Sequence, residues 1–194
     1  MTNDVKNAAN PTTEWLASVF GADTLWRPTE APAALVHTGT LDFLRTVGFP
    51  AVTLDLADLD STKLLAGDIW EADADEIFGR RYPDDDSPPT ELCYAFAVYG
   101  GEYHLMVDGK SGTVDVYDPS GWDHAEGHAG HAFDGVGELA GAIGLLARFE
   151  PRFEGDGAAA ALAELRAAVE ELGWSDSVFW EWVFETLEDE YGDG

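Results

Sequence analysis

The sequence predicts a single α+β domain, in which an antiparallel-rich sheet is surrounded by helices and followed by a C-terminal helical extension. Three observations lead to this expectation. Of the 194 residues, 45% are hydrophobic and 12% aromatic, which is enough to bury a substantial core in one domain. Strand patterns cluster over residues 91–117 as a meander. Helical patterns lie before and after that cluster, an order typical of α+β domains.

Residues 1–10 are predicted to be a flexible leader, and residues 11–194 a single domain. The leader is polar and has no apolar core of the kind found in signal peptides. A short helix is expected to follow it, because Asn10 is a good N-cap and Pro11 suits the first helical position. Gly21 is placed to end this helix.

The next region combines one clear helix with a long irregular stretch. The helix is expected over about residues 40–47, where Gly48 would stop it. Residues 51–90 are acidic and contain several prolines, so they are expected to be mostly loop. Within that stretch, one short strand is predicted near residues 63–66.

The clearest β signal follows. Residues 92–99 are apolar throughout, as in a strand that is buried on both faces. The glycines at 100–101 form a turn, and residues 103–107 form the next strand. Turn residues at 108–112 then lead into an alternating strand at 113–117, which completes an antiparallel meander.

The C-terminal part is expected to be mainly helical. Residues 120–132 are rich in Gly and His and are predicted to form a loop. An apolar stripe over residues 136–146 then predicts a helix. Two further helices are expected over about residues 157–190, separated at Gly173.

Charge is the most unusual property of the composition. The chain has 38 Asp and Glu residues against 10 Lys and Arg, for a formal net charge of −28. Direct binding to nucleic acid or to an anionic membrane is therefore disfavoured, since both require a basic face. Three explanations remain: solubility or life in a salty cytoplasm, a basic partner, and mimicry of a nucleic-acid backbone. No stretch approaches the roughly 20 apolar residues of a membrane span, so a cytoplasmic protein is expected.

A phosphate-loop-like motif and the single cysteine could each indicate a functional site, but a structural role explains both better. Gly109-Lys110-Ser111 resembles the end of a phosphate-binding loop, but His104 occupies the place of the required first glycine and a strand follows. We therefore predict a hairpin turn there. The single cysteine, Cys93, lies in an apolar run and is expected to be a buried, inert thiol.

A histidine cluster raises the possibility of a metal site. His124, His128 and His131 lie close in sequence to Asp123 and Glu126, and these residue types bind zinc and other transition metals. The spacing matches no standard zinc signature, and a Gly-rich loop offers no rigid frame. We therefore favour a solvated loop and predict no metal or other cofactor, with a metal-dependent enzyme kept as an alternative.

Trp182 lies outside the apolar stripe of the last helix. It either packs under another segment or is exposed as an anchor for a partner, and packing is favoured because an exposed Trp is costly. Trp122, in the acidic histidine loop, presents the same two alternatives.

Several segments, in their order along the chain, resemble the SUKH superfamily of bacterial immunity proteins from polymorphic toxin systems. The similarity is strongest to its fourth immunity branch and covers roughly residues 15–185. It rests on residues 24–28, on Leu41-Asp42-Phe43-Leu44 with Gly48-Phe49-Pro50, on the hairpin from Tyr103 to Val114, and on Glu164-Leu165-Arg166 with Phe179-Trp180.

This resemblance implies an α+β fold and a non-enzymatic protein that binds and neutralises a toxin, often a nuclease or a nucleic-acid deaminase. Such toxins tend to be basic, so an acidic inhibitor would be attracted to them and could cover the active-site cleft. An acidic adaptor or DNA mimic is the alternative that charge alone supports. The candidate partner-binding residues are Asp73, Asp75, Glu76, Asp84, Asp85, Asp86, Trp122, Asp123, Glu126 and Trp182.

Overall fold

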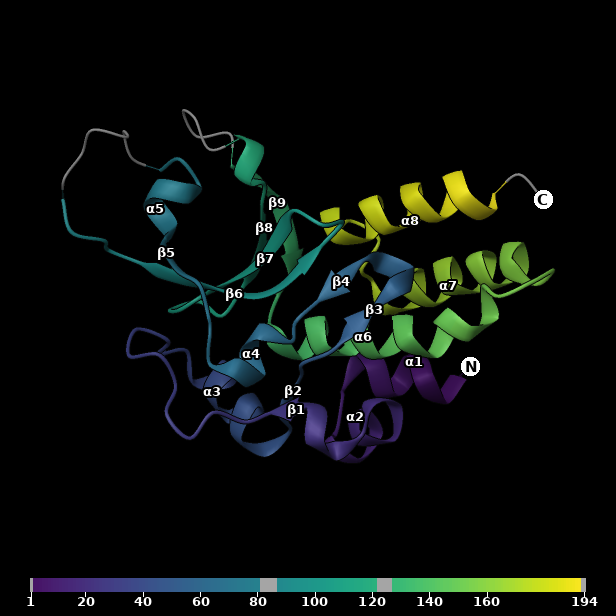
Figure 1. Ribbon diagram of the computed structural model, residues 1–194, viewed down its shortest axis with the longest axis horizontal. Helices are drawn as coiled ribbons and strands as arrows, with labels where there is room; N and C mark the ends of the chain where they lie inside the picture. Colours follow the sequence, from purple (N-terminus) through teal and green to yellow (C-terminus); the bar gives the residue numbers. More distant parts are fainter. Residues whose placement is uncertain (1, 81–86, 122–126, 193–194) are drawn as a thin grey trace.

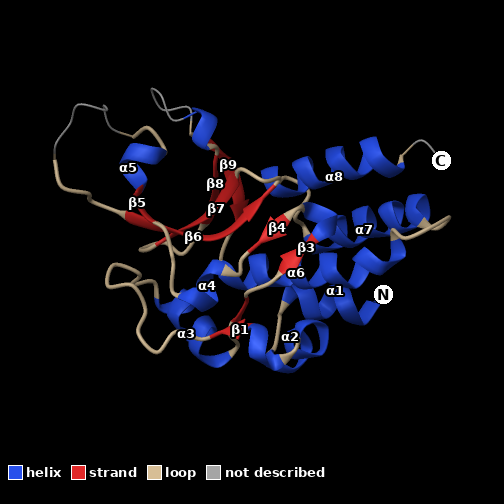
Figure 2. Cartoon of the chain, viewed as in Figure 1, coloured by secondary structure: helices blue, strands red, loops and turns tan. Residues whose placement is uncertain are grey.

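The computed structural model describes residues 2–80, 87–121 and 127–192. Within these residues the chain forms an α+β fold with one seven-stranded antiparallel sheet and one small two-stranded sheet (Figure 1). Helices from both ends of the chain pack together on one side of the large sheet (Figure 2). The predicted fold class is confirmed.

The large sheet has the strand order β3-β4-β6-β7-β8-β9, and β5 pairs with β6 beside β4. All neighbouring strands are antiparallel. The strands are β1 (Leu25–Trp26), β2 (Phe49–Pro50), β3 (Thr53–Leu54), β4 (Leu59–Asp60), β5 (Glu71–Asp73), β6 (Leu92–Tyr99), β7 (Tyr103–Asp108), β8 (Val114–Tyr117) and β9 (His128–Phe133).

The central meander of β6, β7 and β8 agrees with the sequence prediction. Gly100 and Gly101 both adopt positive φ angles, of 58° and 76°, in the turn between β6 and β7. In the next turn, Asp108 Oδ1 accepts hydrogen bonds from the backbone N–H groups of Lys110 and Ser111, at 2.9 and 2.7 Å. The turn between β7 and β8 therefore confirms the hairpin interpretation of this phosphate-loop-like motif.

The helices are α1 (Thr2–Ala9), α2 (Thr13–Phe20), α3 (Thr38–Thr46), α4 (Lys63–Ala66), α5 (Ala74–Ile77), α6 (Val136–Phe149), α7 (Ala158–Leu172) and α8 (Val178–Tyr191). The expected helices α2, α3 and α6–α8 are all present. Thr12, not Asn10, caps α2, since its side chain accepts a hydrogen bond from Trp15 N. No helix among the described residues is both long and apolar enough to cross a bilayer.

Helix α6 is the centre of the hydrophobic core. Leu139, Ile143 and Leu146 are fully buried, and α1, α2, α3 and β9 all contact the helix. A Cβ atom on Gly141 would lie 2.0 Å from the Ala8 carbonyl oxygen, and one on Gly144 would lie 2.4 Å from the Trp15 ring. These two glycines therefore let the N-terminal helices lie directly against α6.

The N-terminus differs from the expected flexible leader. Residues 2–9 form α1, and its Val5 and Ala8 are buried against the core. Two buried apolar residues in so short a segment give no clear periodic signal in the sequence. The helix is stabilised by packing against α6, a tertiary contact that local sequence does not reveal.

Two other segments also differ from the predictions. Residues 63–66 form α4, not a strand: Leu64 is buried and its neighbour Leu65 is exposed. The expected loop at 120–132 contains β9 over His128–Phe133, which is held by pairing with β8 even though it is rich in residues with little strand propensity. The acidic stretch 51–90 contains β3, β4 and β5 with short helices between them.

Candidate functional site

The two faces of the large sheet are covered differently. Helices cover one face of the sheet (Figure 1). The buried residues on that face include Leu105, Val107, Val116 and Phe133. The opposite face has a small buried cluster at α5 that includes Met106 and Tyr117. Tyr117 and the neighbouring side chains outside the cluster define the open face, which consists of Trp70, His104, Asp115, Tyr117, His128 and His131.

Three aromatic rings form the centre of the open face. The Trp70 ring centroid lies 5.0 Å from that of His104 and 5.5 Å from that of Tyr117. Trp70 is still 41% exposed, whereas Tyr117 is buried. Burial, and secondarily the charge of Lys63, lowers the pKa of His104 and favours its neutral form. An exposed Trp held in place by other rings is a rigid anchor of the kind found in protein interfaces.

A charged cluster lies at the β8–β9 edge of the same face. His131 Nδ1 is 3.3 Å from Asp115 Oδ1, and His131 Nε2 is 3.2 Å from Asp134 Oδ1. His128 Nε2 lies 3.7 Å from the same Asp115 oxygen. These contacts become ion pairs when the imidazoles are protonated.

His124 lies outside the described residues. Within the part of the chain that the structure describes, no group of three or more His, Cys, Asp or Glu side chains is arranged to hold a metal ion. The imidazoles of His128 and His131 instead face the Asp115 carboxylate.

Helix α5 and its N-cap residue carry three of the candidate partner-binding carboxylates. Asp73 caps the helix, and its Oδ1 accepts a hydrogen bond from Asp75 N at 3.0 Å. Asp75 in turn accepts a hydrogen bond from the Thr90 hydroxyl. Both are partly buried, whereas Glu76 is exposed. Asp73 and Asp75 thus hold local structure, and Glu76 presents its charge to solvent.

The structure places Gly127, which follows the acidic segment 122–126, against α5. A Cβ atom on Gly127 would lie 2.5 Å from the Ile77 carbonyl oxygen and 2.6 Å from the Tyr117 ring, so the chain at Gly127 touches α5 and the open face. The remaining candidates in these segments lie outside the described residues: Asp84, Asp85, Asp86, Trp122, Asp123 and Glu126.

Trp182 lies elsewhere in the molecule. The centroid of its ring, on α8, lies 5.1 Å from the ring centroid of Tyr99 and 6.3 Å from that of Tyr103. The ring also lies directly against Gly100. The side chain therefore packs under the β6–β7 turn, and packing is the alternative that the sequence favours over exposure. Helix α8 and helix α5 lie at different ends of the sheet, so Trp182 is not brought together with the acidic segments (Figure 1).

Sequence reasoning missed a groove of about 740 Å³ between residues 25–32 and the α4–β5 segment, residues 63–71. The α4–β5 segment contributes Leu65, which is 51% exposed, to the groove, and it contributes Trp70 to the open face. The buried side chain of Tyr94 also lines the groove. Tyr94 stands in a continuous apolar run, so nothing in the sequence separates it from ordinary core residues.

Cys93 has the environment of a structural thiol. It is buried beneath α5, and its Sγ lies 3.6 Å from the Ala72 carbonyl oxygen. Burial, with a smaller contribution from the Asp108 charge, raises the pKa of the thiol to about 12. A nucleophilic cysteine needs the opposite conditions, namely solvent access and a lowered pKa.

A protein-family model described as SUKH-4 immunity protein matches residues 11–124, which is more than half of the chain. Comparisons with curated proteins and with solved structures find no match. The matched range includes the groove, α5 and strands β1–β8, and it ends before β9.

Proposed function

Because the chain belongs to the SUKH-4 immunity protein family, we propose that it binds a cognate toxin and neutralises it. The family match is the observation that carries this proposal. The matched residues contain Trp70 and most of the open face, while β9 and α6–α8 complete the sheet and its core. The surface features that could contact a partner therefore lie largely within the family's common region.

The net charge supports a more specific partner, a basic toxin domain that acts on nucleic acid, such as a nuclease or a deaminase. Enzymes of that kind need positive charge where the substrate backbone lies. A protein with a net charge of −28 would be attracted to such a cleft over long distances and could cover it. Occlusion of the cleft requires no catalytic step by the inhibitor, and we propose that it takes place in the cytoplasm.

The proposed contact surface is the open face, together with the candidate acidic residues of segments 73–86 and 122–126. Trp70 would be its central anchor, because it is the large side chain that remains exposed above a fixed cluster of rings. Glu76, whose charge acts on Tyr117 of the open face, would supply negative charge near this anchor, and we propose that the candidate residues Asp84, Asp85, Asp86, Asp123 and Glu126 add to the attraction. Apolar anchors within a charged rim are typical of tight protein interfaces.

Co-expression with the neighbouring toxin gene tests the function directly. We expect cells to survive only when this chain is present, and a tagged pull-down to retain one basic toxin through a high-salt wash. An equal loss of viability with and without the chain would contradict the proposal for that pair. Several nucleic-acid-binding proteins that are all lost at moderate salt would favour the DNA-mimic alternative.

Charge reversal tests the proposed surface. Replacing Asp84, Asp85 and Asp86 with Lys is expected to weaken toxin binding, because repulsion would replace attraction at the rim. Reversal of Glu170, Glu171 and Asp189 is a matched control, since these three carboxylates are exposed on α7 and α8. Equal loss of affinity in both variants would show that only total charge matters.

A further inference from the structure

We infer that the groove between residues 25–32 and the α4–β5 segment is a socket for an arginine side chain of the toxin. This inference rests on the proposed function and makes its recognition step more specific. It is carried by three features of the groove: its shape, a buried hydroxyl group that makes no well-formed hydrogen bond, and its charge.

The groove is large enough for an extended side chain. Its volume is about 740 Å³, and its walls come from the loop after β1 and from the α4–β5 segment. Trp26, Pro28, Leu65 and Ile69 supply apolar surface to these walls. Such walls suit a side chain with a long apolar stem and a polar end, because the stem can be buried while the end reaches a polar partner.

Tyr94 supplies that polar partner. The residue is 1% exposed, and its hydroxyl group makes no hydrogen bond of good geometry among the described residues, although the Glu71 side chain and the Ala34 backbone lie close to it. Buried hydroxyl groups are normally hydrogen-bonded, so one that lacks a well-formed bond and lines a groove can complete its bonding with a ligand group. The phenolic oxygen has lone pairs that can accept a hydrogen bond from an N–H donor.

A carboxylate lies next to this hydroxyl. Glu71 is the direct cross-strand neighbour of Tyr94 in the pairing of β5 with β6, so both side chains are on the same face of the sheet. Burial, and secondarily a hydrogen-bonding contact with the Glu71 side chain, raises the pKa of Tyr94, which keeps the phenol protonated. An incoming cation would therefore meet a carboxylate and a neutral hydroxyl group together.

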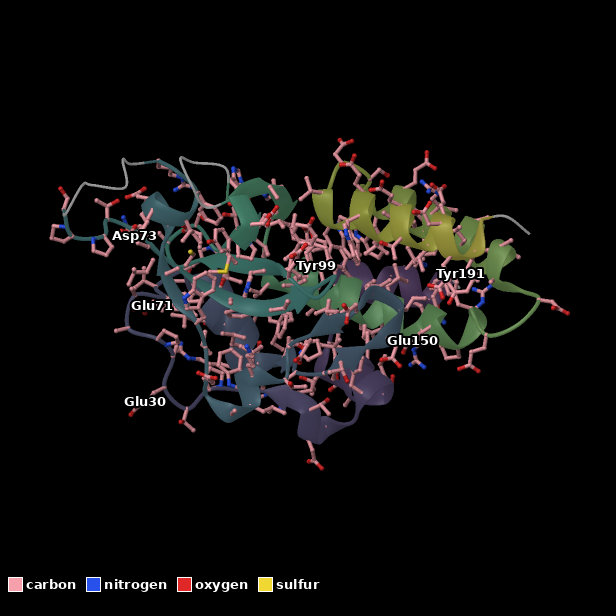
Figure 3. All side chains as sticks on the ribbon, turned by 45° about the horizontal axis from the view of Figure 1, so that its top comes forward. Glu30, Glu71, Asp73, Tyr99, Glu150 and Tyr191 are labelled. Atoms are coloured by element: carbon pink, nitrogen blue, oxygen red, sulfur yellow. The ribbon has the colours of Figure 1, made fainter. Side chains whose placement is uncertain are left out.

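The charges around the groove favour a cationic occupant. Glu30 and Glu71 are both exposed and line the groove, and Figure 3 shows them along one edge of the molecule with Asp73. Arg27 also lines the groove, but its Nη2 donates to the Val47 carbonyl oxygen at 2.7 Å and to the Thr13 hydroxyl at 3.1 Å. Its guanidinium group is thus directed to the α2–α3 region.

Arginine fits these features better than lysine does. The guanidinium group is planar and weakly hydrated, and it stacks well on aromatic and apolar surfaces. It can also donate to a carboxylate and to a neighbouring hydroxyl at the same time through separate N–H groups. A lysine ammonium is more strongly hydrated and would lose more on entering apolar walls.

The first experiment titrates N-acetyl-arginine amide into the ¹⁵N-labelled full-length chain and follows amide and indole chemical shifts. We expect the largest changes at Trp26, Leu65 and Glu71. Tyr94→Phe and Glu71→Gln should each weaken binding at least threefold. Tyr99→Phe is the matched control, because Tyr99 is a buried tyrosine on the same strand that packs against α8. Tyr94→Phe retains the ring, so folding should be preserved.

Three outcomes would overturn the assignment. Equal binding of N-acetyl-citrulline amide would show that charge is not recognised. Equal binding of N-acetyl-lysine amide would show that the guanidinium group is not specifically selected. Shifts that are absent from the groove would show that no arginine enters it.

The second experiment measures binding of the cognate toxin by calorimetry. Tyr94→Phe and Glu71→Gln should each lower affinity at least tenfold, with Tyr99→Phe within twofold of the original chain. If toxin is neutralised but both groove variants bind it unchanged, the socket inference is wrong and the proposed function stands. If the groove binds the arginine amide but the chain protects no cell from the toxin, the proposed function is wrong, and with it the assignment of the arginine to a toxin.

Discussion

The two faces of the large sheet are built from alternate residues of the same strands, yet they have different surroundings. Leu105 and His104 are neighbours on β7; Leu105 is 0% exposed against the helical layer, and His104 lies on the open face beside an exposed Trp. The helix-covered face carries the core that stabilises the fold. The open face retains rings and charges that folding alone does not require, which makes it the better candidate for binding.

The sharpest test of this difference compares truncations at adjacent positions. Leu105→Ala should reduce the free energy of unfolding by about 3 kcal/mol, because it leaves a cavity in a fully buried site. His104→Ala should cost roughly 1 kcal/mol, the scale of one aromatic contact. Urea denaturation followed by circular dichroism measures both values. Equal losses would show that the two faces contribute equally to stability.

A second test asks whether the packing of α1 against α6 contributes to the stability of the core. Gly141→Ala should destabilise the fold by about 2 kcal/mol, since the new methyl group would overlap the Ala8 carbonyl. Gly137→Ala is the matched control in the same helix, because its nearest neighbour would be the Phe43 ring at an ordinary 3.6 Å. Thermal unfolding of the two variants gives the comparison. A neutral Gly141→Ala variant would mean that α1 is not firmly docked.

On the open face, a truncation should reduce toxin affinity more than it reduces the free energy of unfolding. Trp70→Ala is expected to lower toxin affinity by about 2 kcal/mol or more, which is roughly 30-fold, while unfolding changes by about 1 kcal/mol. Val36→Ala provides the control, since Val36 is an exposed apolar residue outside the open face. Calorimetric titration and urea denaturation measure the two effects. A large loss of stability with unchanged affinity would assign Trp70 to the core.

The smallest expected effect is a pH dependence that originates at His104. Its pKa is lowered in the folded chain, mainly by burial and further by Lys63, so the unfolded chain binds a proton more readily. The stabilising contribution is complete above about pH 6.5 and is lost as the pH falls through the folded pKa.

His104→Gln should therefore reduce the decline in stability on acidification from pH 7 to pH 5. Asp60, Asp68 and Tyr117 are the other ionisable groups around this ring, and they are unchanged in the variant. Their titration, with that of the many carboxylates, should cancel when the two profiles are subtracted. Parallel profiles would rule out His104 as a source of pH dependence.

Elements with local sequence signals could be predicted, whereas elements held by distant parts of the chain could not. The meander and the long C-terminal helices have local signals: the turn glycines at 100–101, the Asp108 turn and apolar stripes with helical spacing. Strand β9 and helix α1 lack such signals, because each is held by partners far away in the chain. The exposure of Trp70 and the surroundings of the Tyr94 hydroxyl are tertiary properties, so composition and periodicity gave no indication of them.

The docking of the first two helices on α6 has a consequence for how the chain folds. Arg148 donates a hydrogen bond to Ser18, 130 residues away, and the Ala8 backbone lies directly against Gly141. During synthesis, α1 and α2 would leave the ribosome long before the helix that receives them. Contacts of such long sequence separation slow folding, since a large loop must close before they form. The core should therefore become complete only after α6 has emerged from the ribosome, and until then the apolar faces of the N-terminal helices are exposed to chaperones.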